Sequence, residues 1–404
     1  MRKFSFILAA LLMLVSVESI DAKPKAKAKD NKAKYVFLFI GDGMGTAHVS
    51  TTESYLSYKA GKLGGEQLLM TTFPYYGSVT THSANQNITC SSAAGTAIAC
   101  GEKANNGTVG INKDSLNIES VAYRLQKDGY KIGIISTVPI NHATPSAFYA
   151  HNVNRSNCYE LSHDIPGSGF EFYAGAGFLE FKGKDGNSEP TDEYLEKNGY
   201  SVSYGLTEFR EESMDKEFAV FCQASNREES AENYTSGDKE EVDASLGQML
   251  KLGMEFLGTD EPFFFMCEGG AIDWSAHSNL TMPMIENVLE FDEAIKVAYD
   301  FYLAHPEETL IVVTADHETG GLTLGAGSTT VNWAELEREW IESGKKSTMS
   351  SDENRKFNKK CSIGWTTGSH TGGAVPMFAI GVGAEKFNGR IDNTDIKGKI
   401  LGEK

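Results

Sequence analysis

The sequence predicts an α/β fold, with a mainly parallel central sheet and helices on both of its faces. Two observations support this prediction. Runs of β-branched, aromatic and other apolar residues recur along the chain, at 35–40, 131–137, 262–267, 309–314 and 375–380. Segments in which apolar residues have helical spacing lie between these runs. Strands that are apolar at every position are buried on both faces, which is typical of a parallel sheet between layers of helices.

Two of the intervening segments illustrate the helical spacing. Ile118, Val121 and Leu125 mark the inward face of one expected helix. A longer amphipathic helix is expected to open at Pro283 and to end near His305. In a fold of this class, ligands bind beyond the carboxyl ends of the strands.

Composition narrows the class of protein. With 404 residues, of which 23% are charged, and a mean hydropathy of −0.31, the chain is long enough for a large core and is not mostly disordered. The formal net charge of −18 argues against a nucleic-acid-binding surface, because phosphate backbones require basic partners. The six cysteines leave the disulfide pairing open, although Cys100, Cys222 and Cys267 stand in apolar surroundings and are expected to be buried thiols.

The chain is expected to have three parts. Residues 1–22 read as a signal peptide, because basic residues precede an apolar run and a small residue follows it. Residues 23–34 are rich in lysine and form either a solvated linker or a tail for an anionic surface. Residues 35–404 would be a single catalytic domain, with polar insertions at about 160–245 and 326–362. We therefore expect an exported protein, periplasmic or secreted, that has no membrane span.

Metal-ligand residue types follow the predicted strands, and one precedes the last strand. A single Asp after a strand is usually a helix cap or a turn residue. The joint appearance of several such residues at the same edge of one sheet instead predicts a shared site. These residues are Asp42, His142, Thr144, Glu268, Asp273, His277, Asp316, His317 and His370.

The types of these residues favour two kinds of metal. Asp273 and His277 are four residues apart, so on a helix their side chains leave the same face, which suits a tetrahedral ion. Mixed nitrogen and oxygen ligands suit Zn²⁺, whereas the oxygen-only set of Asp42, Thr144 and Glu268 suits Mg²⁺. We expect two zinc ions and one magnesium ion.

A segment of small residues, 89–101, predicts a helix that packs closely on the sheet and offers its N-terminus to an anion. Ser91, at its start, is either an ordinary helix cap or a functional hydroxyl. Arg155 is either a surface residue or a guanidinium that binds two phosphate oxygens.

Together, these motifs resemble those of the alkaline phosphatase family. The matching segments occur in order along the chain: 40–45, 89–110, 143–145 with Arg155, 268–273 with His277, 314–317, and 370–373. The resemblance implies that Asp273, His277 and His370 hold one zinc, and that Asp42, Asp316, His317 and the nucleophile hold the second. It also implies that Asp42, Thr144 and Glu268 hold magnesium.

The resemblance further implies the roles of the substrate-binding residues. Ser91 would be the nucleophile, with Ser92 as the second choice, and Arg155 would clamp the phosphate. Cys90 stands where the family usually has an Asp that orients this arginine, so the phosphate would be held less tightly. His142 and Trp274 stand where some bacterial relatives have Asp and Lys, and this His and Trp pair resembles other bacterial members of the family. His142 leaves open whether the third site takes Mg²⁺ or Zn²⁺.

The expected activity is hydrolysis of small phosphate monoesters through a phosphoserine intermediate. One alternative is a phosphodiesterase of the same superfamily, which would have no use for Arg155. A more distant one is a non-catalytic protein that binds phosphate or metal. A sulfatase is excluded, because Cys90 is not followed by the Pro and Arg of the sulfatase motif. The resemblance also implies a homodimer.

Overall fold

One ten-stranded sheet forms the centre of the computed structural model, which describes residues 32–227, 243–344 and 349–404. Its strands are β1 (Tyr35–Ile40), β2 (Tyr75–Thr80), β3 (Lys131–Ser136), β4 (Phe172–Gly175), β5 (Ser201–Tyr204), β6 (Ala219–Cys222), β7 (Phe263–Glu268), β8 (Thr309–Thr314), β13 (Val375–Gly381) and β14 (Gly389–Asp392). Their order in the sheet is β14-β2-β13-β8-β1-β7-β3-β4-β6-β5. Strand β13 is antiparallel to both β2 and β8, and the other neighbours are parallel. The predicted mainly parallel α/β fold is confirmed.

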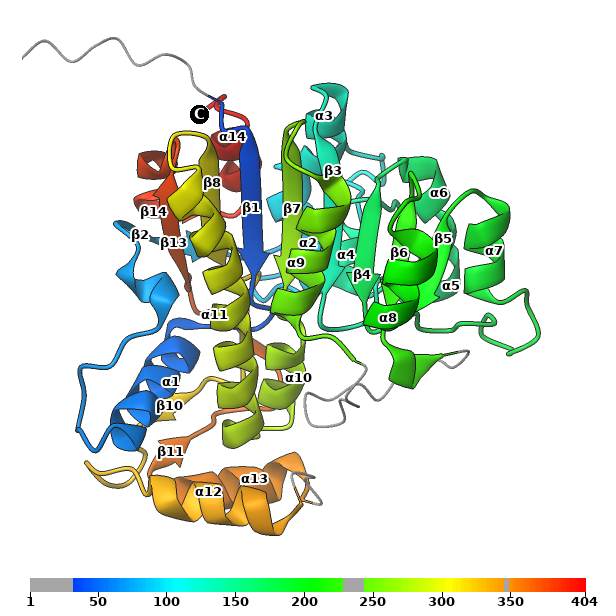
Figure 1. The fold of residues 1–404 in the computed structure, drawn as a ribbon. Helices are drawn as coiled ribbons and strands as arrows, with labels where there is room; N and C mark the ends of the chain where they lie inside the picture. The colour runs from blue at the N-terminus through cyan, green and yellow to red at the C-terminus, as the bar shows by residue number, and fades with distance from the viewer. Residues whose placement is uncertain (1–31, 228–242, 345–348) are drawn as a thin grey trace, which may run out of the picture. The chain divides into compact units, whose positions relative to one another are not determined.

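Helices cover both faces of the sheet (Figure 1). One face carries α9 (Leu246–Leu257) and α11 (Thr281–Ala304), with α1 (Thr46–Lys59) against α11. The other carries α2 (Ser91–Cys100), α3 (Val121–Lys127), α4 (Ala143–Ser146) and α14 (Asp395–Ile400). Every residue of the central strands β1, β7 and β8 is buried, as their continuous apolar sequences predict. None of the helices in the described ranges combines the length and apolar character needed to cross a membrane.

The two predicted helices form with small changes at their starts. Helix α3 begins only at Val121, because Ser120 caps it by accepting a hydrogen bond from the amide of Tyr123. The prediction that Ile118 belongs to this helix is therefore wrong, and its amide instead donates to the carbonyl of Gly110. Helix α11 begins two residues before Pro283, which the first turn of a helix tolerates.

The two regions predicted as insertions both contain regular structure. Residues 160–245 supply β4, β5 and β6, which extend the sheet at one edge. Residues 326–362 contain α12 (Trp333–Glu342) and α13 (Ser351–Lys360). All six cysteines lie in the described ranges as free thiols, and five of them, including Cys100, Cys222 and Cys267, are buried.

The topology brings chemistry-bearing residues to one edge of the sheet. Strands β1, β3, β7 and β8 run in the same direction and end at this edge. Strand β13 runs the opposite way and therefore starts there. Residues that follow the first four strands thus meet residues that precede β13, and β12 (His370–Thr371) lies just before that strand.

Candidate active site

The first group of side chains lies after β1 and β8. His317 Nε2 is 3.3 Å from Asp42 Oδ1 and 3.3 Å from Asp316 Oδ2. All three residues are completely buried. The hydroxyl of Ser91, at the start of α2, lies 3.2 Å from the same nitrogen. The structure therefore joins the predicted nucleophile to three of the predicted metal ligands.

The turn after β1 requires a glycine at position 43. Gly43 has a φ of +72°, a conformation that other residues rarely adopt. Its amide donates to Asp316 Oδ1 at 3.1 Å. A Cβ at this position would lie 2.8 Å from Asp273 Oδ1, so a side chain would push into the site. The bare backbone here lets carboxylates from two other segments approach Asp42.

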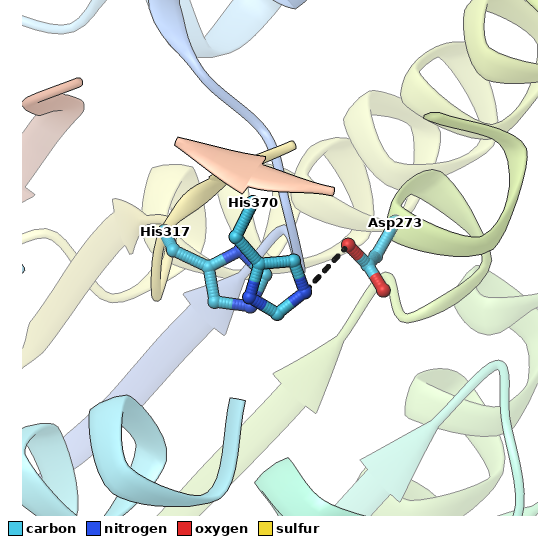
Figure 2. Close-up of side chains that lie close together, drawn as sticks. All are labelled: Asp273, His317 and His370. Atoms are coloured by element: carbon cyan, nitrogen blue, oxygen red, sulfur yellow. Dashed lines mark ion pairs between the residues drawn. The ribbon is translucent and has the colours of Figure 1, made fainter. Parts of the chain in front are cut away.

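A second group comes from α10 (Ala271–His277) and β12, as Figure 2 shows in part. His277 Nε2 lies 3.2 Å from Asp273 Oδ2 and 3.1 Å from His370 Nε2. His370 Nε2 lies 3.7 Å from Asp273 Oδ1, and the rings of His370 and His317 stack with their centres 3.6 Å apart. His317 thus belongs to the first group and also borders this one.

Backbone carbonyls orient two of these histidines. His277 Nδ1 donates to the carbonyl of Gly368 at 2.8 Å, and His370 Nδ1 donates to the carbonyl of Thr89 at 2.9 Å. With Nδ1 engaged in this way, Nε2 of each ring faces the other ligands. This is the arrangement that metal-binding histidines use in proteins.

A third group surrounds the end of β7. Carboxylate oxygens of Asp42 and Glu268 and one imidazole nitrogen of His142 lie within 4.8 Å of one another. Thr144, in α4, is completely buried, and its hydroxyl, like Glu268 Oε1, has no hydrogen-bond partner. The other carboxylate oxygen of Glu268 accepts a hydrogen bond from Ser136.

Unpartnered buried polar atoms concentrate at these groups. Most such side-chain atoms in the described ranges belong to the site: both carboxylate oxygens of Asp42, Asp316 Oδ2, Glu268 Oε1, Thr144 Oγ1 and His142 Nδ1. Leaving a buried polar group unpaired is costly, so natural structures satisfy such groups with protein, water or ions. Oxygen and nitrogen atoms that converge without partners are what bound cations require, so the residues fit the predicted metals.

The electrostatics point the same way. Burial and the neighbouring carboxylates raise the pKa values of Asp42 and Asp316 well above their ordinary range, and burial raises the pKa of Glu268 to about 7. Burial alone would also raise the pKa of Asp273, but the hydrogen bond to His277 and the nearby imidazoles hold it below its ordinary value. The same hydrogen bond raises the pKa of His277 to about 9. Several buried carboxylates at one place favour a compensating positive charge.

The helix that carries Ser91 packs tightly against its neighbours. All ten residues of α2 are buried, and a Cβ added to Gly95 would lie 3.2 Å from the Cβ of Ala147. Cys90 is the N-cap residue, and its side chain does not cap the helix. Ser91 and Ser92 are therefore the first residues of a buried helix whose N-terminal amides are available to an anion. Ser92 Oγ lies 3.2 Å from Cys90 Sγ.

Contacts link Arg155 to the three residues that depart from the family pattern, Cys90, His142 and Trp274. Arg155 Nη2 is 3.3 Å from His142 Nε2. The ring of Trp274 meets His142 edge-on, with the ring centres 5.9 Å apart at 85°. Cys90 Sγ accepts a hydrogen bond from the amide of Gly107, whose carbonyl accepts one from the amide of Arg155.

Two site residues are absent from the sequence-based prediction. Thr319 Oγ1 contacts both Asp273 and His317, and Ser136 donates to Glu268. Thr319 is only two positions after His317. This proximity predicts a contact between the two side chains only if the conformation of the backbone there is known. Ser136 lies inside a predicted strand, where alternation gives no sign of a polar role.

Comparisons with known proteins agree with the geometry. The sequence model of the family described as alkaline phosphatase matches residues 33–175, 227–340 and 333–401. Alkaline phosphatase 4 of Bacillus subtilis is 31% identical, over 95% of this chain and 90% of its own length. Alkaline phosphatase 3 of that organism is 29% identical, over 96% and 92%. The solved alkaline phosphatase from the Antarctic bacterium TAB5 superposes with a TM-score of 0.75 at 30% identity, covering 92% of this chain and 98% of that one. The chain belongs to the alkaline phosphatase family and is an enzyme of that class.

Proposed function

We propose that this enzyme hydrolyses phosphate monoesters through a phosphoserine intermediate at Ser91, in a site that holds two Zn²⁺ ions and one Mg²⁺ ion. The observation that carries the proposal is the position of Ser91. Its hydroxyl lies at the N-terminus of α2, 3.2 Å from His317 Nε2, within a buried group of potential metal ligands. Family membership supports the hydrolysis of phosphate monoesters in general.

The proposed ligand sets follow the three groups of side chains. Asp273, His277 and His370 would hold one zinc. Asp42, Asp316, His317 and Ser91 would hold the other. Asp42, Thr144 and Glu268 would hold magnesium, with His142 beside them; a variant of the TAB5 enzyme has magnesium bound in its M3 site. When bound, these cations would lower the pKa of the serine hydroxyl and neutralise charge on the departing ester oxygen.

The protein's own groups would position the substrate and form the intermediate. The guanidinium of Arg155 binds two phosphate oxygens, and the first amides of α2 face the developing charge. Ser91 Oγ forms a bond to phosphorus as the bond to the ester oxygen breaks on the opposite side, and the alcohol leaves. Water then attacks phosphorus, the bond to Ser91 Oγ breaks, and inorganic phosphate is released with the serine restored.

The alternative function, hydrolysis of phosphate diesters, is favoured by no observed contact. A monoester has three non-bridging phosphate oxygens and a diester has two. With one of these directed at the metal ligands, a diester would leave a single oxygen for the guanidinium of Arg155, which lies 3.3 Å from His142 at the edge of the metal site. A non-catalytic role is excluded by the membership of an enzyme class.

The decisive experiment compares an aryl phosphate monoester with the matching diester, using the mature chain with Zn²⁺ and Mg²⁺ at pH 7 and pH 9. We expect the monoester to react hundreds of times faster, and faster at pH 9. A preference for the diester would overturn the proposal. No turnover of either substrate, with metals shown to be bound, would also overturn it and would point to Cys90 as the departure to test next.

We also propose export and a homodimer. The predicted signal peptide, residues 1–22, and most of the predicted lysine-rich linker, residues 23–34, lie outside the described residues. The sequence pattern of the first 22 residues supports export to the periplasm or the medium. N-terminal sequencing of the secreted protein and light scattering of the purified enzyme test the two proposals separately.

A further inference from the structure

Thr319 lies between the two groups of proposed zinc ligands. Its hydroxyl oxygen is 2.5 Å from Asp273 Oδ1 and 3.2 Å from His317 Nδ1. The residue is completely buried in β9 (Glu318–Thr319), and its backbone pairs in register with His370. One side chain therefore contacts a ligand from each group and is tied through the backbone to a third.

The hydrogen-bond balance fixes the direction of both contacts. A threonine hydroxyl has one proton, and an ionised carboxylate only accepts. The short contact to Asp273 therefore takes the hydroxyl proton. The lone pair of Thr319 Oγ1 must then accept from His317, so the proton of this imidazole is on Nδ1. Nε2 of His317 is left with its lone pair directed at Asp42, Asp316 and Ser91, which lie 3.2–3.3 Å away.

His317 differs in this respect from the other two histidines. His277 and His370 are oriented by the backbone carbonyls of Gly368 and Thr89. In the part of the chain that the structure describes, Nδ1 of His317 instead contacts the side-chain hydroxyl of Thr319. The orientation of this one imidazole therefore depends on the identity of residue 319.

We propose that Thr319 is a positioning residue that couples the two zinc sites, by holding Asp273 at one and setting the tautomer of His317 at the other. The proposal rests on the proposed two-zinc site. The backbone supports it as well, because the amide of Thr319 donates to the carbonyl of Gly43 at 3.0 Å, next to Asp42. Groups that orient metal ligands in this way typically contribute about 10- to 100-fold to metal affinity.

Zinc affinity, rather than activity, tests the proposal. The zinc-loaded enzyme would be titrated with a chromophoric chelator at pH 8, for the parent and for Thr319→Val and Thr319→Ser. Valine keeps the shape of threonine and removes the hydroxyl, whereas serine keeps the hydroxyl. Thr309→Val is a matched control, because Thr309 is also completely buried and its hydroxyl donates to the carbonyl of His305. Thr309 is the first residue of β8, whereas the site lies beyond the last residue of that strand.

We expect Thr319→Val to weaken zinc binding at both sites by about 10- to 100-fold, with Thr319→Ser and Thr309→Val within about threefold of the parent. The proposal is overturned if Thr319→Val binds zinc as the parent does, or if Thr319→Ser is as weak as Thr319→Val. Should the valine variant not fold, the affinity ratio of Thr319→Ala to Thr319→Ser carries the same test. A parent chain that binds no zinc would instead overturn the proposed cofactors, so the two failures are distinguishable.

Discussion

Ser91 and Ser92 are consecutive in α2, yet their hydroxyls have different surroundings. Ser91 Oγ faces His317, and Ser92 Oγ faces Cys90. We therefore expect Ser91→Ala to reduce kcat by at least about 1,000-fold, because no other described hydroxyl takes the place of this nucleophile in the site. Ser92→Ala should retain kcat within about threefold.

Steady-state kinetics on an aryl phosphate measure both effects. Acid quenching during turnover, followed by mass spectrometry of the peptide that contains both serines, locates the phosphoryl group independently. Phosphate found on residue 92 would contradict the assignment, as would an active Ser91→Ala variant.

Gly43 allows a second residue-scale prediction. A methyl group here would meet Asp273 Oδ1 at 2.8 Å and Thr319 Oγ1 at 2.9 Å, in a backbone conformation that alanine disfavours. We expect Gly43→Ala to lower zinc content and to reduce kcat/KM by at least about 100-fold. Metal analysis of the purified variant and kinetics with excess zinc measure the two effects. Gly61→Ala is the control, since Gly61 also has a positive φ, of +70°, but has open space around it. Equal loss in both variants would show that backbone strain alone is responsible.

At the residue scale, the sequence predicts site residues where a potential metal ligand stands at the end of a predicted strand. Asp42, Glu268 and Asp316 follow or end buried apolar strands, and this placement alone predicts their convergence. The sequence does not predict the roles of Thr319 and Ser136, because threonine and serine are common in and beside strands that have no functional site. Their roles depend on distances of a few ångströms between segments far apart in the chain.

At the element scale, some strands can be predicted from the sequence and others cannot. The long apolar strands β1, β7 and β8 are visible in the sequence because they are buried on both faces. The sequence does not predict strand β2, because Tyr75–Thr80 is not a continuous apolar run and Gly77 interrupts it. Strands β4, β5 and β6 are only four residues long and stand in polar sequence. Such short runs do not differ from loops until a neighbouring strand pairs with them.

The junction between α3 and β3 gives an element-scale prediction about alkaline stability. Tyr130 is 7% exposed, and its hydroxyl donates to the carbonyl of Ala33, just before β1, at 2.6 Å. Burial raises the pKa of Tyr130 from 10.0 to about 12. Because the folded pKa is the higher one, the contribution of this hydroxyl is complete below pH 10 and is lost between pH 10 and pH 12.

We therefore expect Tyr130→Phe to cost about 1 kcal/mol in the free energy of unfolding at pH 8, and the difference from the parent to shrink as the pH rises towards 11.5. Urea unfolding of both proteins at pH 8, 9.5, 10.5 and 11.5 measures this difference. The titration of other groups affects both proteins equally and therefore does not contribute to it. Tyr76→Phe, on the exposed side of β2, is the control for removal of a tyrosine hydroxyl that is not buried. A Tyr130→Phe difference that is constant with pH would rule out this explanation.

At the scale of the whole molecule, the net charge opposes the proposed substrate. The chain has 55 acidic and 37 basic residues, for a formal charge of −18, and a phosphate monoester is an anion. The proposed cations and Arg155 supply positive potential only locally. Composition predicts the sign of the distant field, but it does not show where the positive charge lies, since that depends on how strands β1, β3, β7 and β8 bring their ends together.

The dependence of the rate on salt concentration distinguishes the effect of distant surface charges from the effect of charges within the site. Raising the ionic strength from about 0.01 M to about 0.15 M shortens the Debye length from about 30 Å to about 8 Å, which screens distant surface charges more than groups in contact with substrate. If the overall negative charge slows the approach of the substrate, kcat/KM for a dianionic aryl phosphate should rise by about two- to fivefold over this range. A substrate with a smaller net negative charge, such as phosphocholine, should respond less. Parallel series in chloride and acetate separate screening from anion competition at the metal site. A fall in kcat/KM for both substrates would mean that the local positive charge reaches far enough to attract the substrate, and that the net charge of the chain does not govern encounter.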